Sequence, residues 1–138
     1  MCKGGELFDK MDQLKSFDEG RIAEIIKQIL VALNYFHQLN IVHRDLKLAN
    51  VMLHSSDLEN LELKIADFGF ATFFDPAEGL DFQLGSPFFM APEVLNGQMY
   101  SEKIDIWSVG IIAHILLTGD KPFGGDTISQ ITQSVISK

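Results

Sequence analysis

Hydrophobic residues between positions 18 and 39 recur at intervals of three and four, which is the spacing of one face of a helix. They are Ile22, Ile25, Ile26, Ile29, Leu33 and Phe36. The pattern predicts a helix from about Asp18 to Leu39. The segment Ser16-Phe17-Asp18-Glu19 has the spacing of a capping box at the start of this helix, and Asn40 suits its end.

A second helix is predicted from about Ser101 to Thr118, ending at Gly119. Apolar residues lie on nearly every side of it, a pattern that places a helix in the interior of a large domain. They are Ile104, Ile106, Val109, Ile111, Ile112, Ile115 and Leu116. Two shorter helices are expected near Glu6–Leu14 and Thr127–Ser137, the second with Asp126 as its N-cap.

Strand signals are few and short. Val51–Leu53 and Leu61–Ile65 are separated by the polar turn Ser55-Ser56-Asp57, so they are expected to pair as a small hairpin. From Asp67 to Glu93 the chain keeps no regular period, and irregular stretches of this length within a compact domain are usually functional or disordered. The predicted fold class is therefore mainly α with a small β-hairpin and one long functional loop.

Composition narrows the possible functions. The chain has 138 residues, enough for one domain, and 19 acidic against 11 basic residues give a net charge of −8. This balance argues against a general nucleic-acid or anionic-membrane binder, because such proteins neutralise phosphates with Lys and Arg. Cys2 is the only cysteine, which fits a reducing compartment. Neither a signal peptide nor a membrane-spanning run is visible, so a cytoplasmic or nuclear location is expected.

Candidate chemistry lies on both sides of the predicted hairpin. The octapeptide His43–Asn50 precedes it and Asp67-Phe68-Gly69 follows it. A hairpin returns the chain to its origin and would bring Asp67 beside Asn50, two hard oxygen ligands of the kind that bind Mg²⁺. Asp45 offers a carboxylate acceptor, and Lys47 a cation that could neutralise a phosphoryl group. Taken alone, such an Asp–Lys pair is more often a surface ion pair.

The order of the motifs is more informative than any one of them. His43–Asn50 is followed by Asp67–Gly69, Ala91–Glu93 and Asp105–Gly110, the order of the protein-kinase signatures. The chain resembles the C-terminal lobe of a eukaryotic serine/threonine protein kinase over essentially all of its length. The segments Gly4–Asp9 and Leu117–Phe123 are similar to the calcium/calmodulin-dependent and calcium-dependent kinase group.

The resemblance implies the cofactors ATP and Mg²⁺ and a role for each residue of the site. Asp45 is expected to be the catalytic base that accepts the proton of the substrate hydroxyl. Lys47 matches the residue with which serine/threonine kinases steady the γ-phosphate. Asn50 and Asp67 match the two Mg²⁺ ligands. Ser86 matches the hydroxyl residue that contacts the base and shapes the substrate pocket.

Three further positions bear on nucleotide and substrate binding. Met52 matches the residue beneath the adenine ring, although ordinary core packing would explain it equally well. Glu6 matches a position that contacts either the ribose or a basic residue upstream of the phosphorylated one; a helix-start acid is the structural alternative. Ala49 stands where many relatives have Glu, so a second contact to basic substrates is in doubt.

Other matches are structural. His43 and Phe68 are expected to stack in the hydrophobic column that aligns the lobes, and Gly69 completes the same motif. Asp105 lies within an otherwise apolar helix, and a buried carboxylate needs partners. Backbone amides near His43-Arg44 are the family's solution. Glu93 is expected to pair with an arginine downstream of Lys138.

In many kinases, the arginine that matches Arg44 pairs with a phosphate on the activation loop. Here residues 73–84 contain no Ser, Thr or Tyr. Glu78 and Asp81 could supply fixed negative charge instead. We therefore expect that the kinase needs no phosphate on this stretch.

The sequence also shows neither a Gly-rich phosphate loop nor a strand lysine paired with a helix glutamate, which are elements of the N-terminal lobe. Residues 1–138 are thus expected to be a partial kinase domain with the N-lobe absent, inactive and poorly soluble or molten by itself. The expected partners are protein substrates with Ser or Thr, together with an N-lobe and a regulatory domain in a full-length protein. The alternative is a short non-catalytic binding or decoy module. A different metal-dependent enzyme would leave the matches at 91–93 and 105–110 unexplained.

Overall fold

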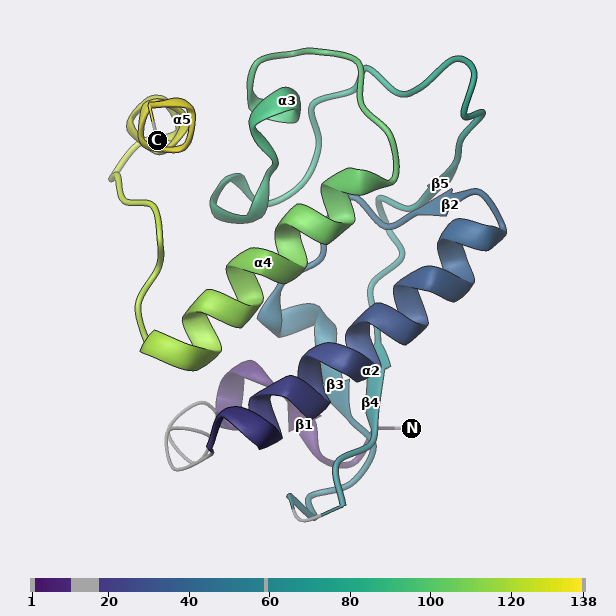
Figure 1. Ribbon diagram of the computed structural model, residues 1–138, viewed down its shortest axis with the longest axis vertical. Helices are drawn as coiled ribbons and strands as arrows, with labels where there is room; N and C mark the ends of the chain where they lie inside the picture. Colours follow the sequence, from purple (N-terminus) through teal and green to yellow (C-terminus); the bar gives the residue numbers. More distant parts are fainter. Residues whose placement is uncertain (1, 11–17, 59, 138) are drawn as a thin grey trace.

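The computed structural model describes residues 2–10, 18–58 and 60–137. Two long helices, α2 (Glu19–Gln38) and α4 (Lys103–Thr118), lie side by side and form the centre of the molecule (Figure 1). A three-stranded sheet lies near the N-terminal end of α2, and a two-stranded sheet near its C-terminal end. The predicted fold class, mainly α with small antiparallel β-structure, is confirmed.

Helix α2 agrees with its predicted bounds to within one residue. Asp18 is the N-cap, and its carboxylate accepts a hydrogen bond from the Arg21 amide at 2.9 Å. Asn40 follows the helix with a φ of 55°, a left-handed conformation that Asn tolerates better than most residues. The other part of the proposed capping box, Ser16, lies outside the described residues.

Helix α4 ends at Thr118, and the next residue, Gly119, is its C-cap as predicted; its φ of 79° is a left-handed conformation that Gly adopts without strain. Most of its apolar side chains are buried. Ile106 and Leu117 are instead 46 % and 54 % exposed, so burial on every side is not observed. None of the helices in the described ranges is long and apolar enough to cross a membrane.

The N-terminal segment differs from its prediction. Gly5–Glu6 forms strand β1, and Phe8–Lys10 forms only a single 3₁₀ turn, η1. A helix over Glu6–Leu14 is therefore wrong for the described part of that range. The reason is tertiary: β1 pairs with a strand some 45 residues later, Gly5 opposite Leu53, and this pairing overrides the local helical pattern.

The C-terminal helix α5 (Ile128–Ile136) was located correctly, but its predicted cap was wrong. Thr127, not Asp126, is the N-cap: its hydroxyl accepts a hydrogen bond from the Gln130 amide, and the Gln130 side chain bonds back to the Thr127 amide. This reciprocal capping box satisfies two orphan amides, whereas a lone Asp one position earlier would satisfy fewer.

The predicted hairpin is confirmed. Strand β3 (Val51–Leu53) pairs antiparallel with β4 (Leu63–Ile65), with Val51 opposite Ile65. Strand β1, the third strand of this sheet, has no signal in the sequence. Neither has the second sheet, in which β2 (Ile41–Val42) pairs with β5 (Thr72–Phe73).

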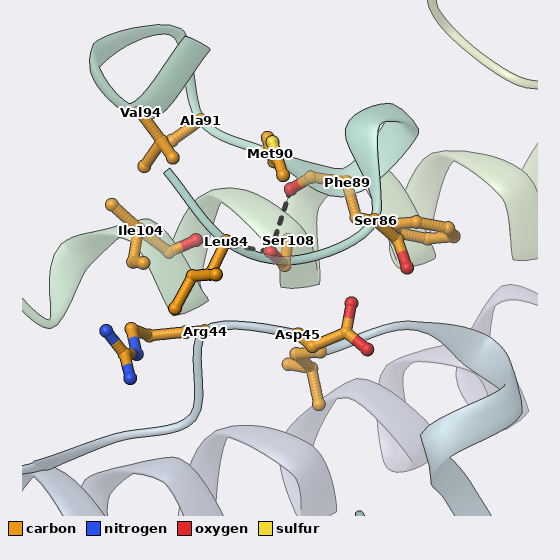
Figure 2. A pocket seen from close by; sticks show the side chains of 11 residues that line it. Arg44, Asp45, Leu84, Ser86, Phe89, Met90, Ala91, Val94, Ile104 and Ser108 are labelled. Carbon is orange, nitrogen blue, oxygen red and sulfur yellow. Dashed lines mark hydrogen bonds between the residues drawn. The ribbon is translucent and has the colours of Figure 1, made fainter. Parts of the chain in front are cut away.

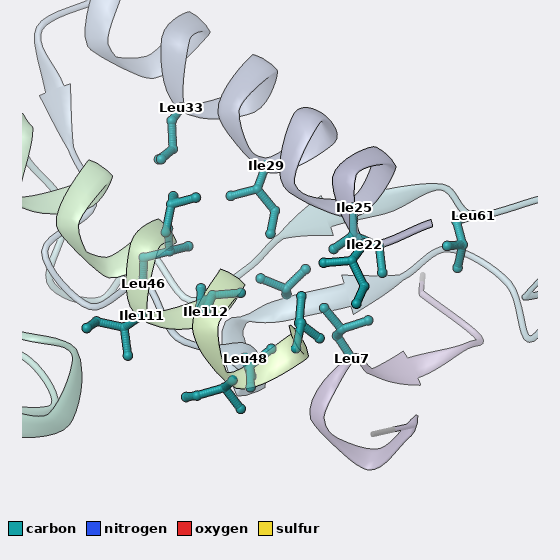
Figure 3. Packing of buried hydrophobic residues seen from close by; sticks show 14 of the residues in the cluster. Leu7, Ile22, Ile25, Ile29, Leu33, Leu46, Leu48, Leu61, Ile111 and Ile112 are labelled. Atoms are coloured by element: carbon teal, nitrogen blue, oxygen red, sulfur yellow. The ribbon is translucent and has the colours of Figure 1, made fainter. Parts of the chain in front are cut away.

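The main core lies between α2, α4 and the hairpin, and it includes two residues of the loop between β2 and β3 (Figure 3). Leu46 and Leu48 of this loop are 0 % and 2 % exposed, and they pack with residues such as Ile25, Ile29 and Ile112. Because alternate loop residues are buried, the backbone of the intervening polar residues is held firmly. The remaining elements are η2 (Leu48–Asn50), η3 (Pro87–Phe89) and α3 (Pro92–Leu95).

Candidate active site

Asp105 fixes the start of the segment His43–Asn50, called here the 43–50 loop. Its carboxylate is fully buried in the first turn of α4. Oδ2 accepts a hydrogen bond from the His43 amide at 2.9 Å, and Oδ1 accepts one from the Arg44 amide at 3.0 Å. The ring Nε2 of His37 lies 2.9 Å from Oδ2. These partners compensate the cost of burying the carboxylate and tie helix α4 to the loop.

The Arg44 backbone is left-handed, with a φ of 67°. For a residue other than Gly this conformation costs roughly 1–3 kcal/mol and persists only where the surroundings impose it. Here the bond from the Arg44 amide to Asp105 holds the turn. The consequence is that the next side chain, Asp45, points in a defined direction.

Asp45 has one occupied and one free carboxylate oxygen. Lys47 Nζ lies 2.7 Å from Oδ2, and Asn50 Nδ2 lies 2.8 Å from the Asp45 carbonyl oxygen. Oδ1 is buried and has no hydrogen-bond partner among the described residues. Figure 2 shows the Asp45 carboxylate directed toward the Ser86 side, while the Arg44 guanidinium points the other way. An unpartnered buried carboxylate oxygen is a ready acceptor for the proton of an incoming group.

Lys47 connects two segments of the chain that are 39 residues apart. Its Nζ lies 3.0 Å from Ser86 Oγ as well as close to Asp45. Ser108 of α4 supports this arrangement because its hydroxyl donates at 2.9 Å to the carbonyl oxygen of Phe89, three residues after Ser86 (Figure 2). One ammonium group therefore lies between an acceptor carboxylate and a hydroxyl.

Gly85 is a residue whose role sequence analysis missed. Its φ is +117°, and a Cβ at this position would overlap the Arg44 carbonyl oxygen. Only Gly lets the segment that carries Ser86 approach the 43–50 loop so closely. The available sequence signal was a glycine next to a candidate site residue, but nothing local shows which backbone it contacts.

The hairpin brings Asn50 and Asp67 to the same end of the sheet. The Ala66 amide donates to the Asn50 carbonyl oxygen at 2.8 Å, so Asp67 is the next residue beyond this pairing. Asp67 has a φ of 60°, and its Oδ1 accepts a hydrogen bond from the Gly69 amide at 3.2 Å. Asn50 donates through Nδ2, while its Oδ1 accepts no hydrogen bond from the described residues.

This donor set fits magnesium bound together with phosphate. Among the described residues, no group of three His, Cys, Asp or Glu side chains could hold a metal ion. Mg²⁺ does not need such a cage, because it commonly uses one or two protein oxygens and completes its shell with water and substrate phosphates. The free Oδ1 of Asn50 and the exposed carboxylate of Asp67 provide oxygens of this kind.

Aromatic contacts join the segment after β4 to the 43–50 loop. The ring centroids of His43 and Phe68 are 5.1 Å apart, and Phe68 also meets Phe36 of α2 edge-to-face at 5.1 Å. His43 Nε2 lies 3.0 Å from the Ala66 carbonyl oxygen. The position of Asp67 is therefore coupled to that of Asp45 through their neighbours.

The two positions linked to nucleotide binding are also brought together. Glu6 in β1 lies directly opposite Met52 in β3, and both are half-buried. The helical setting considered for Glu6 is absent, since Glu6 lies in a strand.

Arg44 and Glu93 are the two residues that were expected to pair with groups of opposite charge. Arg44 donates through Nε to the Phe70 carbonyl oxygen at 2.6 Å, and it forms no ion pair with Glu78 or Asp81, all within the described ranges. The side chain of Glu93, at the start of α3, makes no hydrogen bond or ion pair with another described residue.

Comparison with known proteins identifies the family. A family model described as the protein kinase domain matches residues 1–138, and the chain therefore belongs to the protein kinase family. It is 44 % identical over 136 residues to myosin light chain kinase A of Dictyostelium discoideum, a match that covers 99 % of this chain and 46 % of the relative.

Two other relatives of the chain also have names that describe protein kinases. Calcium-dependent protein kinase 4 of Plasmodium berghei is 44 % identical over 132 residues, covering 96 % of this chain and 25 % of the relative. Serine/threonine-protein kinase PEPKR2 of Arabidopsis thaliana is 38 % identical over 135 residues, covering 98 % of this chain and 28 % of the relative. These similarities confirm the predicted resemblance of the chain to serine/threonine kinases of the calcium/calmodulin-dependent and calcium-dependent group. The chain spans between about a quarter and a half of the length of these relatives.

Proposed function

We propose that the protein transfers the γ-phosphate of ATP to serine and threonine hydroxyls of protein substrates. The observation that carries the proposal is the environment of Asp45. One oxygen of its carboxylate is held by Lys47, and the other is buried without a hydrogen-bond partner among the described residues. A carboxylate arranged in this way is oriented and still able to accept a proton.

Each residue of the site has a role in this proposal. Asp45 Oδ1 accepts the proton of the substrate hydroxyl and orients the hydroxyl oxygen toward the phosphate. Lys47, fixed between Asp45 and Ser86, stabilises negative charge on the transferred group. Asn50 and Asp67 would hold Mg²⁺, which would supply positive charge to neutralise the phosphates of ATP.

Nucleotide and substrate contacts complete the proposal. Met52 lies beneath the adenine, and Glu6, its cross-strand neighbour, contacts the ribose or a basic substrate residue. Ser86 orients the acceptor next to Lys47. Residues 1–138 form the C-terminal-lobe part of a kinase domain, and a longer protein supplies the N-lobe and regulatory segments, so that this chain by itself is inactive.

The test is transfer of radiolabelled phosphate from ATP to serine peptides by the full-length protein that carries these residues. Asp45→Asn is expected to lower the rate by about 10²–10⁴-fold, the usual contribution of a general base. Lys47→Ala is expected to lower it by roughly 10²–10³-fold through the loss of one preorganised charge. The control is Asp120→Asn, an exposed position whose side chain makes no hydrogen bond with the described residues.

An Asp45→Asn variant that transfers phosphate at the wild-type rate would refute the assignment of the base. Complete absence of transfer by the wild-type protein, with any serine or threonine peptide, would instead support the non-catalytic binding module.

A further inference from the structure

A set of hydrogen bonds joins the middle of the long irregular segment to the chain just before α4. Leu80 and Tyr100 form a short antiparallel bridge, in which the amide of each residue donates to the carbonyl oxygen of the other at 2.9 and 2.8 Å. The Tyr100 hydroxyl donates to the Phe82 carbonyl oxygen at 2.6 Å, and Gln83 Nε2 donates to the Leu95 carbonyl oxygen at 3.3 Å. These four hydrogen bonds are called here the Tyr100 tether.

Tyr100 is a firm point of attachment. It is 5 % exposed, and it packs in the second core cluster with residues such as Val94 and Ile104. Leu80 packs against the same cluster. Because a tyrosine that is nearly buried usually needs a partner for its hydroxyl, the Phe82 carbonyl oxygen stabilises the ring position as much as the hydroxyl stabilises Phe82.

Gly79 allows the bridge to form. Its φ is +74°, and a Cβ at this position would press against the Tyr100 carbonyl oxygen, which accepts the Leu80 amide. The amide of Gly79 also donates to the Asp75 carbonyl oxygen at 2.9 Å, which closes the turn before the bridge. The residue directly before Leu80 therefore has to be a glycine for the two backbones to meet.

The tether continues directly into the proposed reaction centre. Two residues separate Gln83 from Ser86. One of them, Leu84, lines a small pocket together with Asp45, and Figure 2 shows its side chain directed toward the 43–50 loop. A shift of the tethered segment would therefore be passed on to Ser86, whose hydroxyl lies beside the ammonium group of the site.

The start of α4 is a common reference for both sides of the site. Asp105 holds the 43–50 loop from the first turn of the helix, and Tyr100, five positions earlier, holds the segment that leads to Ser86. Residues 73–84 contain no hydroxyl that could carry a phosphate. The hydrogen bonds of the tether are thus available to order this segment without any modification of it.

We propose that Tyr100 is a positioning residue: its hydroxyl holds the segment that carries Ser86 against the 43–50 loop and so takes the place of a phosphate on residues 73–84. The inference rests on the proposed function and adds how the site is kept in its working arrangement.

The first experiment measures the tether without any phosphate transfer. Phe82 is 66 % exposed, but chymotrypsin can cleave after it only when the segment opens and enters the protease as an extended chain. Tyr100→Phe keeps the ring and the bridge to Leu80 and removes only the hydroxyl. In the full-length protein, the rate of cleavage after Phe82, followed by mass spectrometry, is expected to rise about fivefold, the effect of one hydrogen bond on the open population.

The chain provides a matched control because it has two tyrosines. Tyr35 of α2 is 61 % exposed, and its hydroxyl makes no hydrogen bond with the described residues. Tyr35→Phe should therefore leave the rate of cleavage after Phe82 within about twofold of wild type. Circular dichroism and urea unfolding establish that both variants are folded under the conditions of the assay.

The second experiment separates positioning from a merely structural role. At a temperature at which Tyr100→Phe is folded, kcat for a serine peptide should fall about three- to tenfold, since small displacements of a positioned group are costly. KM for ATP should stay within about twofold, because Asn50 and Asp67 lie at the β3–β4 hairpin and not in the tethered segment. A hydroxyl that only stabilises the fold would leave both constants unchanged under these conditions.

Two glycines test the bridge independently of the hydroxyl. Gly79 and Gly97 both have a positive φ, so an alanine is strained at either position, but only at Gly79 would its Cβ meet Tyr100. Gly79→Ala should raise the rate of cleavage after Phe82 about tenfold, whereas Gly97→Ala should leave it within about twofold.

The proposal is overturned if Tyr100→Phe is cleaved after Phe82 at the wild-type rate, if it is cleaved faster but keeps kcat within twofold of wild type, or if Gly79→Ala and Gly97→Ala behave alike. Failure of the proposed function has a different signature. A wild-type protein that transfers no phosphate would refute the kinase activity, while the cleavage rates would still show whether the Tyr100 hydroxyl holds the segment.

Discussion

Removal of the Asp105 carboxylate should both destabilise the protein and impair its site. In Asp105→Ala, the amides of His43 and Arg44 lose their acceptor, and His37 loses its partner. The carboxylate is fully buried, so water does not replace it directly. A buried donor left without a partner costs about 1–3 kcal/mol, which gives about 2–6 kcal/mol for the two amides.

We expect a loss of about 3–5 kcal/mol in the free energy of unfolding, the range for removing one partner of a buried charged group. Against a total stability of about 5–15 kcal/mol for a typical domain, this is a large fraction. The same substitution releases the left-handed turn at Arg44 and with it the orientation of Asp45. The rate of phosphate transfer should therefore fall even at temperatures at which the variant is folded.

Urea unfolding of the full-length protein, followed by circular dichroism, measures the change. Asp105→Asn is the milder variant because it keeps one oxygen acceptor and the shape of the side chain. Asp120→Ala is the control at an exposed position and should change stability by about 0.5 kcal/mol or less. If Asp105→Ala lost less than about 1 kcal/mol, less than one unsatisfied buried donor, the anchoring role would be wrong.

Three further predictions concern the close backbone approach at Gly85, the role of phosphorylation, and the exposed apolar side chains of α4 and α5. Gly85→Ala should lower the transfer rate about 10²-fold by displacing the segment that carries Ser86, whereas Gly97→Ala, which also has a positive φ but open space around it, should not. Phosphatase treatment should leave the rate within about twofold, because residues 73–84 lack an acceptor and the Arg44 side chain already bonds a carbonyl; a tenfold loss would contradict this. The 138-residue chain expressed by itself should associate and bind a hydrophobic dye, because α4 and α5 expose apolar side chains; a sharp thermal transition with micromolar Mg·ATP binding would oppose it.

The parts of the fold that sequence analysis predicted are those whose pattern is local and long enough to repeat. Helix α2 repeats its apolar spacing over about four turns from Ile22 to Phe36, and the end of α4 is marked by Gly119. The proximity of Asn50 and Asp67 was also predictable, because the pairing of a hairpin follows from two short apolar runs and the turn between them.

The missed features depend on contacts between distant residues. Strand β1 has two residues and therefore no period, and it forms because β3 offers a free edge. Strands β2 and β5 also have two residues each, and they form by pairing with each other in a separate sheet. The role of Gly85 depends on the Arg44 carbonyl oxygen, 41 positions earlier in the chain, which no local pattern reveals.

The β3–β4 hairpin has a practical consequence for labelling. Among the described residues, the backbone hydrogen bond nearest the turn joins the His54 amide to the Glu62 carbonyl oxygen at 2.8 Å, and beyond it Ser56 and Asp57 are exposed. Asn50 and Asp67 lie at the opposite end, where the strand register has already been set. An epitope tag or fluorophore inserted between Ser56 and Asp57 would therefore lengthen the turn without shifting that register, which makes it a suitable attachment point for following the protein while it works.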